Sequence, residues 1–221
     1  MARLARAIIP DVPHHVTQRG NGRQRVFFDD GDYAFYRDLL ADRARREGVG
    51  VWGWVLMPNH VHLILTPPDA DALRRVLAGV HRAHAGRIHA RTGRSGHFWQ
   101  GRFGCVAMDE AHLRAAFAYV ALNPVRAGLA ERAEDWRWSS ARAQLGIADD
   151  GITDAAPLRA RVPDFAAMLA GPAEEAALLA LRRAETIGRP VGDREFLAGA
   201  EARLERPLAA GKRGRKRRGC E

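Results

Sequence analysis

The spacing of apolar residues along the chain predicts a mixture of strands and helices. Residues 13–20 have the composition of a strand, and the turn-like segment 21–23 follows them. Residues 29–48 predict a helix, because acidic residues open the segment, Arg45 and Arg46 close it and an apolar stripe runs along it.

The middle of the chain predicts a β-hairpin followed by a helix. Two β-rich segments, 49–57 and 60–66, are separated only by Pro58 and Asn59, which is typical of a hairpin. After these strands, apolar residues at helical spacing predict a helix over 71–89.

A glycine-spaced loop at 91–104 then mixes aromatic residues with arginines. A short strand is expected at 105–109. A helix is expected at 110–123, since Pro124 disfavours helical backbone in the residue before it. Strands and helices arranged around a central hairpin predict an α+β fold, in which helices pack on an antiparallel sheet.

The composition changes after residue 146. Residues 148–172 look like a linker with marginal helix, and helices are expected at 173–184 and 193–205. The end of the chain is too charged and too rich in glycine to pack, so we expect it to be disordered when free. The expected organisation has three parts: a first domain, a linker with a helical extension that is a candidate for DNA binding, and a basic tail, at 1–146, 147–211 and 212–221.

The net charge of +9 favours a polyanionic partner such as nucleic acid. Five of these nine charges lie in the last ten residues, which hold six basic residues and one acidic residue. No apolar run approaches the length of a membrane span, and the start of the chain is no secretory signal, so no membrane association is expected. Cys105 and Cys220 lie far apart, which favours a cytoplasmic protein with reduced thiols. A DNA partner would make this protein nucleoid-associated.

The second strand of the hairpin carries His60 and His62 with only Val61 between them. Residues two apart in a strand lie on the same face, so both imidazoles point the same way. Either they are two ordinary histidines, or they are two ligands of a metal ion. A metal needs a further ligand, and Tyr119 and Asn123 share one helix face four residues apart. Asn123 is therefore a candidate third ligand with the Tyr119 hydroxyl beside it, whereas the competing interpretation makes Tyr119 a core residue.

The other histidines and tyrosines are interpreted as structural or surface residues. One of His14 and His15 is expected to face the core. Tyr33 and Tyr36 complete the apolar stripe of their helix. An arginine-rich helix surface facing phosphates or solvent is expected to hold His81, His84 and His89.

Five segments in order carry a resemblance to a known family: HHVTQRGNGRQRVFF, VLMPNHVHLIL, HFWQGRF, YVALNPVRAGL and WRWSS. They resemble the REP-associated tyrosine transposases, which are single-tyrosine members of the HUH nuclease superfamily related to small insertion-sequence transposases. The resemblance covers roughly residues 5–146. It implies a ferredoxin-like HUH endonuclease fold for the first domain and makes that domain the catalytic one.

By position in these motifs, His60 and His62 match the HUH pair, Asn123 the third metal ligand and Tyr119 the nucleophile. The implied cofactor is Mg²⁺ or Mn²⁺, which would bind a scissile phosphate oxygen as a Lewis acid. The implied reaction nicks and rejoins single-stranded DNA at palindromic, hairpin-forming repeats through a 5′-phosphotyrosine, without a nucleotide cofactor. Whether the protein is a monomer or a homodimer stays open.

Candidate DNA contacts lie in three places. Trp99 and Arg102 combine a stacking aromatic with a phosphate-binding cation, although an anchor of the loop to the core explains Trp99 equally well. The end of the first strand offers Arg19, Asn21 and Arg23 for reading hairpin or flanking bases. Non-specific phosphate binding is expected of the tail residues Lys212, Arg213, Arg215, Lys216, Arg217 and Arg218.

Two other functions compete with a transposase. A non-catalytic DNA-binding regulator of hairpin repeats would bind hairpins without metal and cleave no strand. A metallohydrolase using activated water would turn over without a covalent protein–DNA species. The sequence disfavours the hydrolase, because no carboxylate accompanies the two-histidine strand as a general base.

Overall fold

The structure is a computed structural model that describes residues 6–172 and 175–208, without the side chains of 185–187. One sheet contains the strands β1 (His14–Arg19), β2 (Gly50–Met57), β3 (His60–Thr66) and β4 (Gly104–Ala107). Their order is β2-β3-β1-β4, and each pairs antiparallel with its neighbours. The helices between them in the chain are α1 (Asp30–Arg46) and α2 (Ala72–Thr92). This β-α-β-β-α-β connectivity is ferredoxin-like and confirms the predicted fold class.

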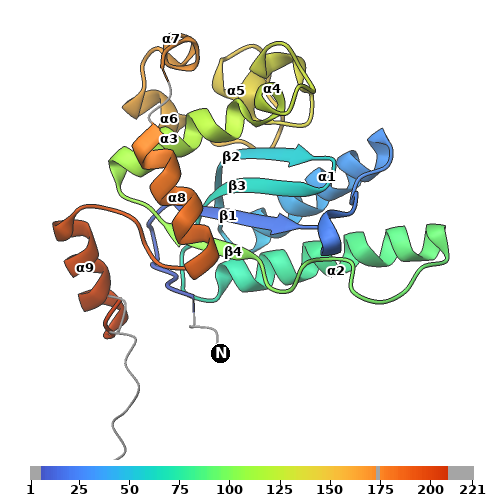
Figure 1. The fold of residues 1–221 in the computed structure, drawn as a ribbon, viewed down its shortest axis with the longest axis horizontal. Helices are drawn as coiled ribbons and strands as arrows, with labels where there is room; N and C mark the ends of the chain where they lie inside the picture. The colour runs from blue at the N-terminus through green and yellow to red at the C-terminus, as the bar shows by residue number, and fades with distance from the viewer. Residues whose placement is uncertain (1–5, 173–174, 209–221) are drawn as a thin grey trace, which may run out of the picture.

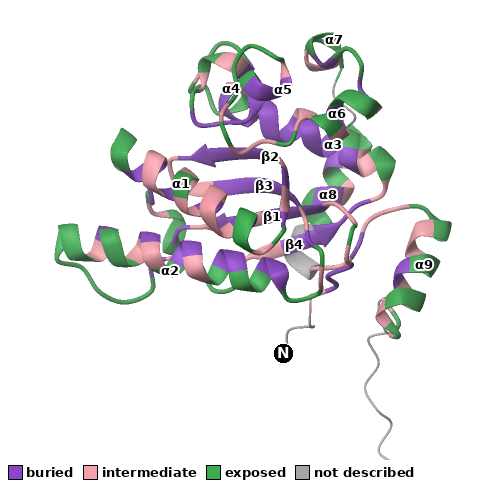
Figure 2. Ribbon diagram, turned by 180° about the vertical axis from the view of Figure 1, so that it is seen from behind, coloured by how far each residue is buried: buried purple, intermediate pink, exposed green. Residues whose placement is uncertain are grey.

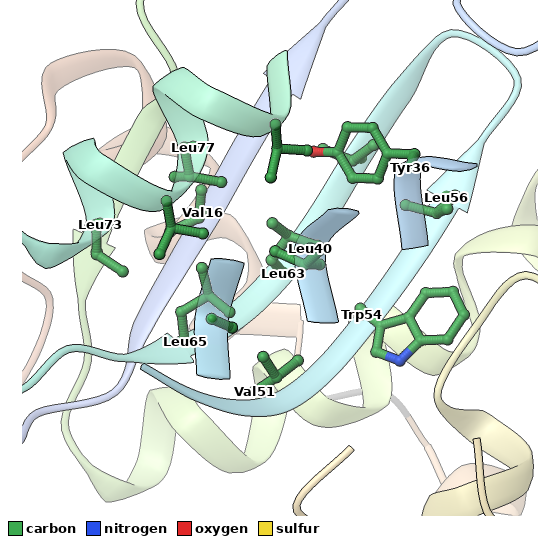
Figure 3. Packing of buried hydrophobic residues seen from close by; sticks show 14 of the residues in the cluster. Val16, Tyr36, Leu40, Val51, Trp54, Leu56, Leu63, Leu65, Leu73 and Leu77 are labelled. Atoms are coloured by element: carbon green, nitrogen blue, oxygen red, sulfur yellow. The ribbon is translucent and has the colours of Figure 1, made fainter. Parts of the chain in front are cut away.

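Helices α1 and α2 pack on one face of the sheet, and α1 lies in front of the sheet in Figure 2. The core between them is apolar, as expected from the stripes of both helices. Figure 3 shows its central members: Val16, Tyr36, Leu40, Val51, Trp54, Leu56, Leu63, Leu65, Leu73 and Leu77. Tyr33 belongs to the same cluster, so the prediction that Tyr33 and Tyr36 are core residues is confirmed.

The opposite face of the sheet carries α3 (Glu110–Ala121) and α8 (Glu175–Ile187), the latter drawn in front of the sheet in Figure 1. Helix α3 buries Leu113, Phe117 and Val120, which recur at three- and four-residue spacing, in one cluster with Val55 and Ile64 of the sheet. Because strand residues alternate faces, β3 turns its even-numbered residues toward this side. The second core is therefore the one beside the two histidines.

The helix predicted up to Asn123 ends earlier, at Ala121. A separate turn, α4 (Asn123–Arg126), follows it with Pro124 in its first turn. Proline has no N–H, so residue 124 cannot donate to the carbonyl of Val120 as a continuous helix would require. The break leaves Asn123 at the start of the new turn.

The remaining helices are η1 (Asn21–Arg23), η2 (Ala133–Asp135), α5 (Ala141–Gln144), α6 (Ala156–Arg161), α7 (Phe165–Ala170) and α9 (Arg194–Leu204). The linker interpretation of 148–172 is wrong in part, because Leu158, Val162 and Phe165 are buried in the same cluster as α3. Their apolar side chains find a partner surface that local composition does not reveal. The division into three parts stays a prediction, and the tail at 212–221 lies outside the described residues. None of the described helices is long and apolar enough to cross a membrane.

Candidate active site

The sheet places His60 and His62 on one face, as predicted. In the register of β1 and β3, His60 lies opposite Arg19 and His62 opposite Thr17. The two imidazole rings are 4.9 Å apart, centre to centre, and nearly perpendicular. His62 is buried and His60 is half-buried at the start of β3. The pair therefore opens toward the end of the sheet at which the hairpin turns.

A third histidine, His15 of β1, joins this pair, and sequence reasoning missed it. Its ring stacks on that of His62 with centres 5.1 Å apart, and its Nε2 lies 3.0 Å from His62 Nδ1. His14 points to the other side, where its Nε2 accepts from the Ile9 N–H. One of the two residues was expected to face the core, and the structure buries both, on opposite faces of the sheet. The alternation of β1 could have placed His15 on the same face as Arg19, but only the register reveals its partner.

A hydrogen bond at Nδ1 orients the imidazole ring of both His60 and His62. His60 Nδ1 lies 2.6 Å from Asn59 Oδ1, while the Asn59 amide nitrogen donates to the Arg23 carbonyl. An amide oxygen can only accept, so His60 Nδ1 carries the proton and Nε2 keeps its lone pair. His62 Nδ1 is hydrogen-bonded to His15, so Nε2 is the nitrogen of His62 that could bind a metal ion. Both imidazoles thus have the outer-shell hydrogen bond that metal-binding histidines make.

Burial keeps both histidines neutral near pH 7. Desolvation, with a smaller contribution from Arg19, lowers the pKa of His60 to about 4, and a side-chain hydrogen bond with Asn123 opposes this shift. Desolvation also lowers the pKa of His62 well below its usual value, and His15 is the next cause. The neutral imidazole is the form that ligates a metal, so no proton needs to be displaced.

Tyr119 and Asn123 reach the same cluster from α3 and α4. The Tyr119 ring meets the His62 ring edge-on at 5.1 Å and the His15 ring at 6.0 Å, centre to centre. Both Tyr119 and Asn123 are 8% exposed. The predicted juxtaposition of His60, His62, Tyr119 and Asn123 is therefore present in the fold, and their chemical roles stay predictions.

Three candidate DNA-binding residues lie at the end of β1. Asn21 and Arg23 are exposed in η1, directly after Arg19, which faces His60 across the strand pair. The loop from the distant segment 91–104 joins them here, because Gln100 N–H donates to the Arg19 carbonyl. The predicted contacts therefore gather at the sheet end that also holds His60.

The structure shows how Trp99 is placed in the loop 91–104, for which base stacking and anchoring to the core were the two interpretations. Its indole N–H donates to the His81 carbonyl at 3.0 Å, and its ring packs beside His84, so Trp99 anchors the loop. Arg102 is exposed, and its contact with DNA stays a prediction. The tail candidates Lys212, Arg213, Arg215, Lys216, Arg217 and Arg218 lie outside the described residues.

The surface location expected for the histidines of α2 is wrong for two of them. His81 and His84 are buried, and burial lowers the pKa of His81 to about 3. His81 Nε2 lies 3.0 Å from the Tyr36 hydroxyl, and His84 Nε2 lies 2.8 Å from the Val26 carbonyl. These histidines satisfy buried polar groups and belong to the core.

Comparison with known proteins places this chain in a class. A family model described as "Transposase IS200 like" matches residues 9–123, just over half of the chain, and this range includes both histidines of the pair, Tyr119 and Asn123. The protein is therefore a transposase, a class of DNA-cleaving enzymes. More particularly, the chain belongs to the IS200-like transposase family.

One solved structure supports the fold. The chain is similar to a REP-associated tyrosine transposase solved bound to a REP hairpin, with 21% identity, 70% of this chain and 98% of that chain covered, and a TM-score of 0.53. A weaker similarity, with a TM-score of 0.39 and 20% identity over 58% of this chain and 98% of the other, is to a candidate transposase from Deinococcus radiodurans R1, and it adds no support for the fold. No curated protein matches the chain.

Proposed function

We propose that the protein is a metal-dependent single-stranded DNA endonuclease and strand transferase, which cuts at palindromic repeats through a phosphotyrosine at Tyr119. The observation that carries this proposal is the edge-on contact of the Tyr119 ring with His62, 5.1 Å between ring centres, beside the pair of His60 and Asn123. Membership of the transposase family supports the reaction class. The hairpin bound by a protein of similar fold supports hairpin DNA as the substrate.

The residues present fit a divalent ion. In the described part of the chain, no three His, Cys, Asp or Glu side chains converge as a metal site. An ion here would therefore take His60, His62 and the amide oxygen of Asn123 as protein ligands. Two imidazoles and one amide suit Mn²⁺, and Mg²⁺ is the alternative for an oxygen-rich shell completed by phosphate and water. When bound, the ion would neutralise charge on the scissile phosphate and polarise it toward attack.

The chain's own residues account for the rest of the reaction. Contacts with His62 and Leu178 hold the Tyr119 ring in place. The Tyr119 oxygen forms a bond to phosphorus as the bond from phosphorus to the 3′ oxygen breaks. The 3′ oxygen takes a proton and becomes a hydroxyl, while the phenol loses its proton to solvent. Because the phosphoester is kept on the protein, a second 3′ hydroxyl can reverse the step without a nucleotide cofactor.

A labelled single-stranded hairpin from the repeats of the protein's own genome tests this proposal. With Mg²⁺ or Mn²⁺, DNA labelled at its 3′ end is expected to give a protein-sized band on a denaturing gel, whereas the same DNA labelled at its 5′ end gives a shortened free strand. Tyr119→Phe is expected to abolish the band and keep hairpin binding. Tyr33→Phe, which changes a core tyrosine on the far face of the sheet, is the matched control and keeps the band.

The same gel separates the competing functions. Shortened DNA without a protein-sized band indicates attack by water and a metallohydrolase. Intact DNA with both metals, together with hairpin binding, indicates a non-catalytic regulator.

A further inference from the structure

Arginines from two separate elements lie beside Tyr119. The guanidinium carbon of Arg126, in α4, is 5.6 Å from the centre of the Tyr119 ring, and that of Arg182, in α8, is 5.1 Å from it. Both distances are within the range of cation–π attraction. Both residues are exposed, so their charged ends are within reach of a bound ligand.

The packing of α8 explains why Arg182 lies there. Leu178 is buried against Tyr119 and Ala115. Arg182 follows Leu178 by four residues, so the two side chains share one face of the helix. Figure 1 shows α8 crossing in front of the sheet beside α3. An apolar anchor thus fixes the helix and places its arginine one turn further along the same phenol ring.

A third arginine adds positive charge beside the histidine pair. Arg19 lies directly opposite His60 in the pairing of β1 with β3, on the face of the sheet that carries the histidine pair. Cations beside a nucleophile favour the approach of an anionic substrate such as a phosphodiester.

We propose, resting on the proposed function, that Arg126 and Arg182 form a clamp that binds the non-bridging oxygens of the scissile phosphate while Tyr119 attacks. Negative charge grows on these oxygens and on the leaving 3′ oxygen as the bond from the Tyr119 oxygen to phosphorus forms. Guanidinium groups offer paired N–H donors that match phosphate oxygens, and donors aimed at developing charge accelerate such steps. Both arginines lie outside the residues 9–123 that match the family model, so the following part of this chain supplies the clamp.

Single-turnover formation of the covalent adduct tests the clamp. Arg182→Ala and Arg126→Ala are each expected to slow the adduct by about 100-fold, the effect of removing one donor to a charged transition state, with hairpin affinity changed less than about threefold. Arg182→Lys keeps the charge but loses the paired donors, so we expect a smaller loss of about tenfold. Arg183→Ala is the matched control, since Arg183 is exposed on the same helix. It is expected to leave the rate unchanged.

A second substrate separates a phosphate contact from a structural effect. A methylphosphonate at the scissile position lacks one charged oxygen. If the arginines act on phosphate charge, the loss caused by Arg182→Ala falls from about 100-fold to below about tenfold on this substrate. If Arg182 only positions α8, both substrates slow equally.

Three results would overturn the clamp: equal losses on both substrates, a loss matched by Arg183→Ala, or an unchanged or faster adduct in Arg182→Ala. They differ from failure of the proposed function, in which the wild-type protein forms no adduct at all. A wild-type adduct with unaffected arginine variants refutes the clamp alone.

Discussion

Replacement of His15 by alanine is the sharpest test of how the candidate metal site is held. His15 is fully buried, and its Nε2 lies 3.0 Å from His62 Nδ1. For His62 to ligate through Nε2, its Nδ1 must carry the proton and donate it to His15. Without His15 this buried N–H loses its acceptor, and the ring loses the hydrogen bond that selects its tautomer.

The expected magnitude follows from that single bond. Loss of an outer-shell partner lowers metal affinity by about 10- to 100-fold, or about 1.4 to 2.8 kcal/mol. His15→Gln supplies an amide oxygen as acceptor, so its loss is expected to be smaller. His14→Ala is the matched control, because His14 is equally buried in the same strand and points to the other face. It lowers the free energy of unfolding and leaves metal affinity unchanged.

Calorimetric titration with Mn²⁺ measures the affinity. Long-range ¹H–¹⁵N NMR on the metal-free protein, at a pH where His62 is neutral, reports which of its nitrogens carries the proton. The reasoning predicts protonated Nδ1 in the wild type and a mixture of tautomers in His15→Ala. Wild-type Mn²⁺ affinity in His15→Ala, or a His62 proton found on Nε2, would refute it.

Three further predictions concern stability and binding. Burial lowers the pKa of His14 to about 4, so the unfolded state binds more protons than the folded state between pH 6.5 and 4. The free energy of unfolding should therefore fall as the pH is lowered through this window, by about 2 kcal/mol from pH 7 to pH 5 for His14 alone. Denaturant titrations that show no such loss would contradict this. Phe117→Ala is expected to lower the free energy of unfolding by about 3 to 5 kcal/mol, because Phe117 is fully buried between α3 and the sheet. Phe28→Ala, at a residue that is 41% exposed, should lower it far less. Equal losses in chemical denaturation would refute the assignment of the second core. Deletion of 212–221 removes six basic residues, so hairpin binding measured by fluorescence anisotropy should become weaker and less dependent on salt concentration. An unchanged salt dependence would exclude the tail from binding.

Local pattern was enough for most of the fold. The strands, the hairpin at Pro58 and Asn59 and the α+β class follow from short-range signals that the structure confirms, whereas the ferredoxin-like arrangement was implied by the family resemblance. The shared face of His60 and His62 also follows from strand alternation alone. The burial of His84 in α2 could also have been predicted from helical spacing, because His84 lies four residues from both Val80 and Ile88 of the buried stripe.

The parts that sequence reasoning missed depend on long-range pairing. His15 meets His62 only because β1 pairs with β3 in one register, and a shift by one residue would place it on the other face. Arg182 meets Tyr119 only because α8 returns across the sheet, about sixty residues later in the chain. No local propensity specifies either contact, so the candidate site could be predicted as a pair of histidines and a tyrosine but not with its surroundings.

Mass spectrometry of the protein–DNA adduct tests the central claim most directly. After nuclease trimming, trypsin releases residues 115–126, whose only tyrosine is Tyr119. The account predicts that this peptide carries the mass of a 5′-linked nucleotide, and that fragmentation places it on Tyr119. A nucleotide on any other residue, or an adduct that persists in Tyr119→Phe, would contradict it.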